Sequence, residues 1–127
     1  MRIPLPPRVL AIMAAVAPVA AAATPIDPQS LPGARVWQAR CSACHNLDSN
    51  KVGPLHRGVY GRAAGTAPGF GYSPGMKPSG IVWNDQTLDQ WLQVPQKLVK
   101  GARMYFTLSD PADRTAVIAY LKAVSGK

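Results

Sequence analysis

The sequence predicts a small all-α domain, and three observations support this prediction. Apolar residues recur at helical spacing in three segments, close to residues 33–44, 84–94 and 111–124. No alternating strand pattern extends beyond the short run Ile81-Val82-Trp83. The chain has 127 residues, of which 47% are hydrophobic and 16% charged, which fits one domain and excludes a multidomain enzyme.

Residues 1–23 predict a secretory signal peptide. Arg2 and Arg8 flank the start, residues 9–19 are almost wholly apolar, and residues 20–23 supply small side chains at a cleavage site. The apolar run is shorter than the roughly 20 residues that a membrane helix needs. We therefore expect export to the periplasm and no stable membrane insertion after cleavage, with an uncleaved N-terminal anchor as the alternative.

Residues 24–32 are expected to form an extended leader, and residues 33–127 the folded domain. The leader contains Pro25, Pro28 and Pro32, and proline lacks an amide donor and restricts the residue before it. From Gly33 an apolar stripe predicts a helix that ends at the cysteine pair Cys41 and Cys44. Residues 46–80 then contain too many glycines and prolines for regular elements, and so long a loop in a compact domain must wrap something.

The two remaining helices have clear local signals. Asn84 or Asp85 is a suitable N-cap for the second helix, and Pro95 should end it at about Val94. Asp110 caps the last helix, and Pro111 occupies its first position. An apolar stripe follows at Val117, Tyr120, Leu121 and Val124, whereas Arg114, Lys122 and Lys127 are expected to face solvent.

The run Cys41-Ser42-Ala43-Cys44-His45 has the C-x-x-C-H spacing of a c-type haem attachment site. Two thiols one turn apart can form thioethers with the two haem vinyl groups, while His45 binds the iron. A thioredoxin-like redox pair would need a βαβ setting, and a zinc site would need more ligands, for which only His56 remains. We expect one covalent haem c with its iron.

The sixth iron ligand decides what such a haem does. An open position favours ligand binding or catalysis, whereas a second protein ligand favours electron transfer. The candidates are His56, Met76 and Met104. Met104 is favoured because Gly101 permits a tight turn before it and a thioether suits a high reduction potential, whereas Met76 could pack beside the haem and a histidine in the basic loop at position 56 is typically solvated.

Several further motifs occur in order along the chain. They are Lys51-Val52-Gly53-Pro54, Gly61-Arg62, Pro68-Gly69-Phe70-Gly71-Tyr72-Ser73, Gly80-Ile81-Val82-Trp83, Thr87-Leu88, Gly101-Ala102-Arg103-Met104 and Ile118-Ala119-Tyr120-Leu121-Lys122. With the haem motif, they make residues 33–122 resemble a class I cytochrome c of the mitochondrial-like bacterial subgroup. The resemblance implies helices wrapped around one covalent haem, with long Gly/Pro-rich loops.

The resemblance also implies the ligand set and the haem contacts. Cys41 and Cys44 would form the thioethers, His45 and Met104 would bind the iron, and the Pro54 carbonyl would accept the His45 ring proton. Arg62, Tyr72 and Trp83 match positions that hold the haem propionates, Phe106 matches an aromatic that shields the methionine side, and Gly33 and Trp37 match the face that packs against Tyr120 and Leu121.

Three residues depart from the family pattern near Met104. Trp91 replaces a tyrosine whose hydroxyl touches the methionine sulfur, Ala102 replaces a threonine, and Lys100 replaces a proline. We expect these changes to tune the reduction potential and the iron–sulfur bond rather than to remove the ligand.

The charge suggests the kind of partner. The chain has 14 basic residues against 6 acidic ones, all of them Asp, a formal charge of +8, which becomes +6 when Arg2 and Arg8 leave with the signal. Four residues flank the expected haem edge and could steer docking onto acidic redox proteins: Lys77, Lys97, Lys100 and Arg103. Nucleic-acid binding is not expected, because no basic run with interleaved aromatic residues occurs.

These observations predict a monomeric periplasmic one-electron carrier, for example of a respiratory chain, and not an enzyme. Two alternatives remain open. One is a haem subunit tightly bound to a periplasmic dehydrogenase or oxidase. The other is an open-site haem protein of the peroxidase-like or gas-binding kind.

Overall fold

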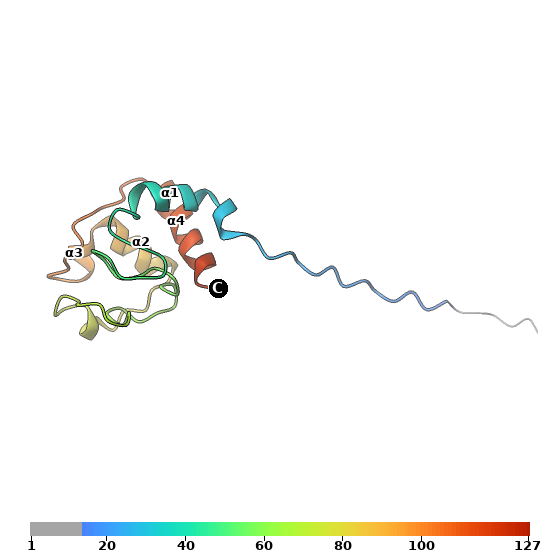
Figure 1. Cartoon of the computed structure of the whole chain (residues 1–127), viewed down its shortest axis with the longest axis horizontal. Coiled ribbons are helices and arrows are strands. Elements are labelled where there is room, and N and C mark those ends of the chain that lie inside the picture. The colour runs from blue at the N-terminus through green and yellow to red at the C-terminus, as the bar shows by residue number, and fades with distance from the viewer. Residues whose placement is uncertain (1–13) are drawn as a thin grey trace, which may run out of the picture.

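The computed structural model describes residues 14–127. The first half of the expected signal peptide therefore lies outside the described residues. Residues 14–27 are extended and exposed, and they run away from the folded body (Figure 1). Between residues 14 and 127, no helix is both long enough and apolar enough to cross a membrane.

The folded body is helical, as the sequence predicts. Its α-helices are α1 (Pro32–Arg40), α2 (Asp85–Gln93), α3 (Pro95–Leu98) and α4 (Pro111–Val124), and its 3-10 helices are η1 (Pro28–Ser30) and η2 (Lys77–Ser79). In this part of the chain the extended pairing is limited to a single antiparallel bridge between Ala63 and Val82. The all-α prediction is confirmed.

The helix starts lie where the capping residues predict them. The Asn84 side chain accepts a hydrogen bond from the amide of Thr87, whose hydroxyl in turn accepts one from the Asn84 amide, so two amides at the start of α2 that lack helical partners are satisfied. Asp110 accepts hydrogen bonds from the first amides of α4, and Pro111 follows it. Both predicted N-termini are therefore confirmed.

Three boundaries differ from the prediction. The end of the expected leader is not extended, because the Asp27 side chain caps a turn that forms η1. The first helix ends at Arg40, and the cysteines lie on a tight turn after it in which the Cys44 amide donates to the Cys41 carbonyl. Pro95 ends α2 but also begins the short α3, since proline suits the first helical position.

Helices α1 and α4 pack against each other at the upper edge of the folded body, where α4 passes behind α1 (Figure 1). Gly33 lies so close to α4 that a β-carbon there would be 2.8 Å from the Tyr120 β-carbon. The Trp37 ring packs against the Tyr120 ring, with 6.0 Å between their centroids. The predicted packing of these two helices is confirmed.

Arg114 contradicts the expectation that it faces solvent. It is buried on α4, and its Nε donates to Asp89 on α2 at 2.7 Å. Its Nη1 donates to the carbonyls of Leu108 and Ser109, at 2.9 and 2.8 Å. These two carbonyls precede α4 and lie near α2, so the guanidinium holds the segment between the two helices in place.

The long loop between α1 and α2 is fixed by a few specific hydrogen bonds. Asn50 donates to the Pro68 carbonyl at 2.8 Å and accepts from the Leu55 amide at 3.0 Å, which ties two turns of the loop together. Near its end, the Trp83 amide donates to the Arg62 carbonyl at 3.0 Å. The loop thus folds back on itself.

Candidate functional site

The two thiols lie on the turn that follows α1. Both are free, and Cys44 is exposed whereas Cys41 is partly buried. Burial raises the pKa of the Cys41 thiol to about 11, so the folded chain keeps it protonated at neutral pH. The His45 amide donates to the Cys41 carbonyl at 2.9 Å, which places the imidazole directly after the second thiol.

The imidazole of His45 is buried, and one hydrogen bond fixes its tautomer. Its Nδ1 lies 2.7 Å from the Pro54 carbonyl oxygen, which can only accept a hydrogen bond. Nδ1 therefore carries the proton, and Nε2 keeps its lone pair. Burial, partly offset by this hydrogen bond, lowers the pKa of His45 and favours the neutral ring. A neutral imidazole with a fixed tautomer is the form that binds a metal.

Gly53 lies against the edge of the same ring. A β-carbon at this position would lie 2.7 Å from each of the two ring nitrogens of His45. The Gly53 amide donates to the Cys44 carbonyl at 2.8 Å, so the backbone is tied to the turn that carries the imidazole. Only glycine leaves room for His45 here.

His56 contradicts the expectation of a solvated side chain. Its ring stacks on the His45 ring, with a centroid separation of 3.9 Å and an angle of 23° between the planes. Its Nδ1 accepts a hydrogen bond from the Trp37 indole at 2.8 Å. Burial, followed by the charges of His45 and Arg62, holds the pKa of His56 well below its usual range. The sequence could not show this contact, because it joins a loop residue to α1.

Met104 lies on the loop between α3 and α4, where side chains hold it. Its sulfur accepts a hydrogen bond from the Trp91 indole Nε1 at 3.2 Å. The Gln96 amide donates to the Met104 carbonyl at 2.6 Å and to the Ala102 carbonyl at 3.2 Å. Trp91 thus keeps a donor on the methionine sulfur, although it replaces the tyrosine of the family pattern.

The surroundings of Met104 are apolar. Met76 and Ala102 are buried members of the hydrophobic core, and Met104 packs against that core. The rings of Trp83 and Trp91 meet edge to face at 5.3 Å. Met76 is thus a buried sulfur in the same core as Met104, so an experiment on the sixth ligand must compare the two.

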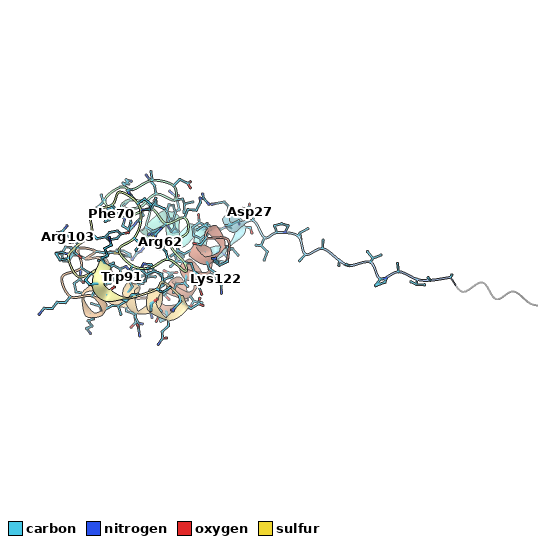
Figure 2. The ribbon with its side chains drawn as sticks, turned by 90° about the horizontal axis from the view of Figure 1, so that it is seen from below. Asp27, Arg62, Phe70, Trp91, Arg103 and Lys122 are labelled. Atoms are coloured by element: carbon cyan, nitrogen blue, oxygen red, sulfur yellow. The ribbon has the colours of Figure 1, made fainter. Side chains whose placement is uncertain are left out.

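Two buried polar atoms in the folded body have no partner within the described chain: Arg62 Nε and Ser73 Oγ. Arg62 donates through Nη2 to the Leu55 carbonyl at 3.0 Å, and burial lowers its pKa. The Tyr72 hydroxyl accepts from the Ala67 amide at 3.0 Å and keeps its own proton for another acceptor. Figure 2 shows Arg62 and Trp91 within the outline of the folded body and Arg103 at its edge; Arg62 and Trp91 are partly buried.

Ser73 was missed by the sequence interpretation as a separate site residue, although it ends the motif that contains Tyr72. A serine in a loop is ordinary, and only its burial reveals the unused hydroxyl.

Phe106 is partly buried, and the Arg40 guanidinium lies 5.6 Å from its ring centroid. The aromatic expected on the methionine side therefore contacts the end of α1.

These groups fit a haem. Buried donors without partners at Arg62 and Ser73 suit carboxylates, two thiols one turn apart suit two vinyl groups, and the Nε2 lone pair of His45 suits iron. Together with the methionine sulfur held by Trp91, they would hold the porphyrin from several sides.

The chain is similar to several known proteins. The family model described as Cytochrome c matches residues 30–125. Cytochrome c2 iso-2 of Magnetospirillum fulvum is 46% identical over 87 residues, which cover 66% of this chain and 91% of the relative. Cytochrome c of Gibberella zeae is 40% identical over 94 residues, covering 71% of this chain and 89% of the relative. The solved structure of cytochrome cH from Methylobacterium extorquens superposes with a TM-score of 0.67 at 42% identity, covering 71% and 93% of the two chains.

Proposed function

Because the chain belongs to the cytochrome c family, whose members are electron carriers with a covalent haem c, we propose that it is an exported one-electron carrier with His45 and Met104 as iron ligands. The bound haem iron supplies the ferric–ferrous couple. The protein contributes attachment, ligand orientation and an apolar surrounding.

The observation that carries the proposal is the state of His45. Its Nδ1 donates to the Pro54 carbonyl, so the nitrogen that remains unprotonated is Nε2. Cys41 and Cys44 precede it on one turn, so attachment and ligation come from a single short segment. On the other side we assign Met104, because its sulfur is already oriented by the Trp91 N–H. An iron that binds both His45 and Met104 has no open position for a substrate, which supports electron transfer over catalysis.

The ligand assignment predicts different outcomes for the two buried methionines. In the ferric protein, the iron–methionine charge-transfer band should be present in the parent, absent in Met104→Ala and retained in Met76→Ala. Met76→Ala is the matched control, because it removes a buried thioether from the same core. Absorption spectra of the oxidised and reduced proteins measure this directly.

Other outcomes would redirect the assignment. Loss of the band in Met76→Ala alone would move the ligand to Met76. A parent that is high-spin, or that binds carbon monoxide readily, would favour the open-site haem protein. Copurification with a dehydrogenase or oxidase in constant ratio would favour the bound-subunit alternative. The intact mass of the same preparation tests export, since a cleaved chain begins at Thr24 and carries one haem.

We assign docking of acidic redox partners to a basic surface around the methionine loop, which is the loop between α3 and α4 that carries Met104. This surface consists of Lys77, Lys97, Lys100 and Arg103, all of which are exposed. Gly75 lies close enough to the Lys100 carbonyl that a β-carbon would be 2.8 Å from it, so the Lys77 and Lys100 loops are neighbours. None of these four cations pairs with an acidic side chain within residues 14–127. Unpaired like charges on one face favour encounter with an anionic partner.

Charge reversal on this basic surface should slow electron uptake from an anionic donor. With ferrocyanide as the probe, Lys100→Glu/Arg103→Glu should lower the second-order rate roughly tenfold at low salt, and added salt should narrow the difference. Arg35→Glu/Lys127→Glu, which reverses two exposed cations outside this surface, is the control with the same net charge. Equal rates in the control and the double variant would show that net charge acts rather than this surface. We further propose that the carrier works as a monomer.

A further inference from the structure

A row of ring contacts connects the helix pair to the imidazole of His45. The Tyr120 ring packs on Trp37 at 6.0 Å, and the Trp37 indole donates to His56 at 2.8 Å. His56 then stacks on His45 at 3.9 Å. His56 is not a ligand in this arrangement, because its ring lies against the face of His45 rather than opposite its nitrogen.

The hydrogen bond from Trp37 fixes the state of the His56 ring. An indole N–H can only donate, so Nδ1 of His56 accepts and the ring proton lies on Nε2. Turning the ring by 180° about its bond to the β-carbon would replace the acceptor with a C–H group. The donor therefore selects one ring plane and one tautomer of His56.

The hydrogen bond of His45 to Pro54 leaves one motion of that ring unrestrained. A bond to a single carbonyl oxygen fixes where Nδ1 lies, but the ring can still tilt about the Nδ1–oxygen direction. Gly53 limits the ring at its edge. The flat His56 ring covers its face at an angle of 23°, which opposes tilting while leaving the in-plane lone pair on Nε2 uncovered.

We propose that His56, held by Trp37, is a positioning residue that sets the plane of the His45 imidazole. The proposal rests on the proposed function, in which His45 binds the haem iron. When His45 binds iron, the plane of its imidazole would set its overlap with the iron d orbitals, because groups behind a metal ligand fix its ring orientation and tune the metal. His56 and Trp37 thus act on the iron through His45.

Simple space-filling does not account for this pair. Leucine has a volume close to that of histidine and would fill the same site without burying a polar ring. The chain instead places a donor and an acceptor together, 19 residues apart in sequence, in a partly buried position. A satisfied polar pair specifies orientation, which an apolar contact does not.

The test uses the ferric, haem-loaded protein and two variants that break the row at different points. His56→Leu removes the flat ring, and Trp37→Phe removes the donor while keeping an aromatic side chain. Proton NMR of the ferric protein reports the spread of the four haem methyl resonances, which follows the axial ligand planes. Both variants should change the order or spread of these resonances. The double variant should show no further change, because each single variant already interrupts the same row of contacts to His45.

Tyr120→Phe is the control for a general loss of stability. It keeps the ring that packs on Trp37 and loses only the hydrogen bond that the Tyr120 hydroxyl accepts from Gln29 at 3.0 Å. It should lower the unfolding midpoint and leave the methyl pattern unchanged. If one site variant folds poorly, the methyl pattern of the other variant against that of the parent still tests the role of the row.

The outcomes separate this inference from the proposed function. A low-spin parent with a methionine band, and variants whose methyl pattern equals that of the parent, would overturn the role of His56 alone. Additive changes in the double variant would show that the two residues act independently and would also overturn it. A parent without histidine ligation would overturn the proposed function itself.

Discussion

Gly53→Ala should prevent His45 from reaching the iron. A β-carbon at position 53 would lie 2.7 Å from both ring nitrogens, and neither partner can move away easily. The backbone is held by its amide bond to the Cys44 carbonyl, and the ring is held by the Pro54 carbonyl. Disturbing the surroundings of a metal ligand typically costs about 10–100-fold in metal affinity, and a displaced ring should fall at the upper end of that range.

The yield of haem-loaded protein and its ferric spectrum measure this effect. Gly58→Ala is the matched control, because Gly58 has a positive φ of 77° but nothing within 4 Å of its added β-carbon. That control should cost about 1 kcal/mol of stability through backbone strain and leave the spectrum unchanged. A Gly53→Ala protein with the parent's low-spin spectrum would contradict the close approach.

Gly33→Ala should destabilise the protein by about 3 kcal/mol or more. Its β-carbon would lie 2.6 Å from the Ala116 carbonyl carbon on α4, and a further contact with Tyr120 blocks the other direction. The helices can accept the methyl group only by moving apart. Helix propensity alone would instead raise the free energy of unfolding, because alanine is about 1 kcal/mol more favourable than glycine inside a helix.

Denaturant unfolding of the haem-loaded protein distinguishes destabilisation by the steric clash from stabilisation by helix propensity. A lower free energy of unfolding for Gly33→Ala would support packing as the dominant effect, whereas a higher one would show that α1 and α4 have space between them. Ala39→Gly, at an exposed position of α1, gives the propensity term by itself and should cost about 1 kcal/mol.

The sequence predicts best those features that depend on near neighbours in the chain. Asn84 and Asp110 start their helices through hydrogen bonds to residues two or three positions away. The spacing of Cys41, Cys44 and His45 likewise lies within one turn. Such contacts need no knowledge of the rest of the fold, which is why they could be predicted.

The features that the sequence analysis missed depend on distant segments. Arg114 was expected in solvent because it lies beside the apolar stripe of α4, yet carbonyls at 108–109 and a carboxylate on α2 surround it. His56 was expected in solvent because its loop is basic, yet its partner is on α1. Neither partner could be identified before the helices and loops were placed relative to one another.

The two sides of the site differ in how the backbone holds them. The turn that carries His45 is joined by backbone hydrogen bonds to α1 and to Gly53. In the described chain, residues 103–107 form no backbone–backbone hydrogen bond, and the Gln96 and Trp91 side chains hold Met104 instead. Segments with few backbone bonds open at a lower free energy than the rest of a domain. The methionine loop should therefore open before the turn that carries His45, so in the proposed carrier a small external ligand would displace Met104 rather than His45.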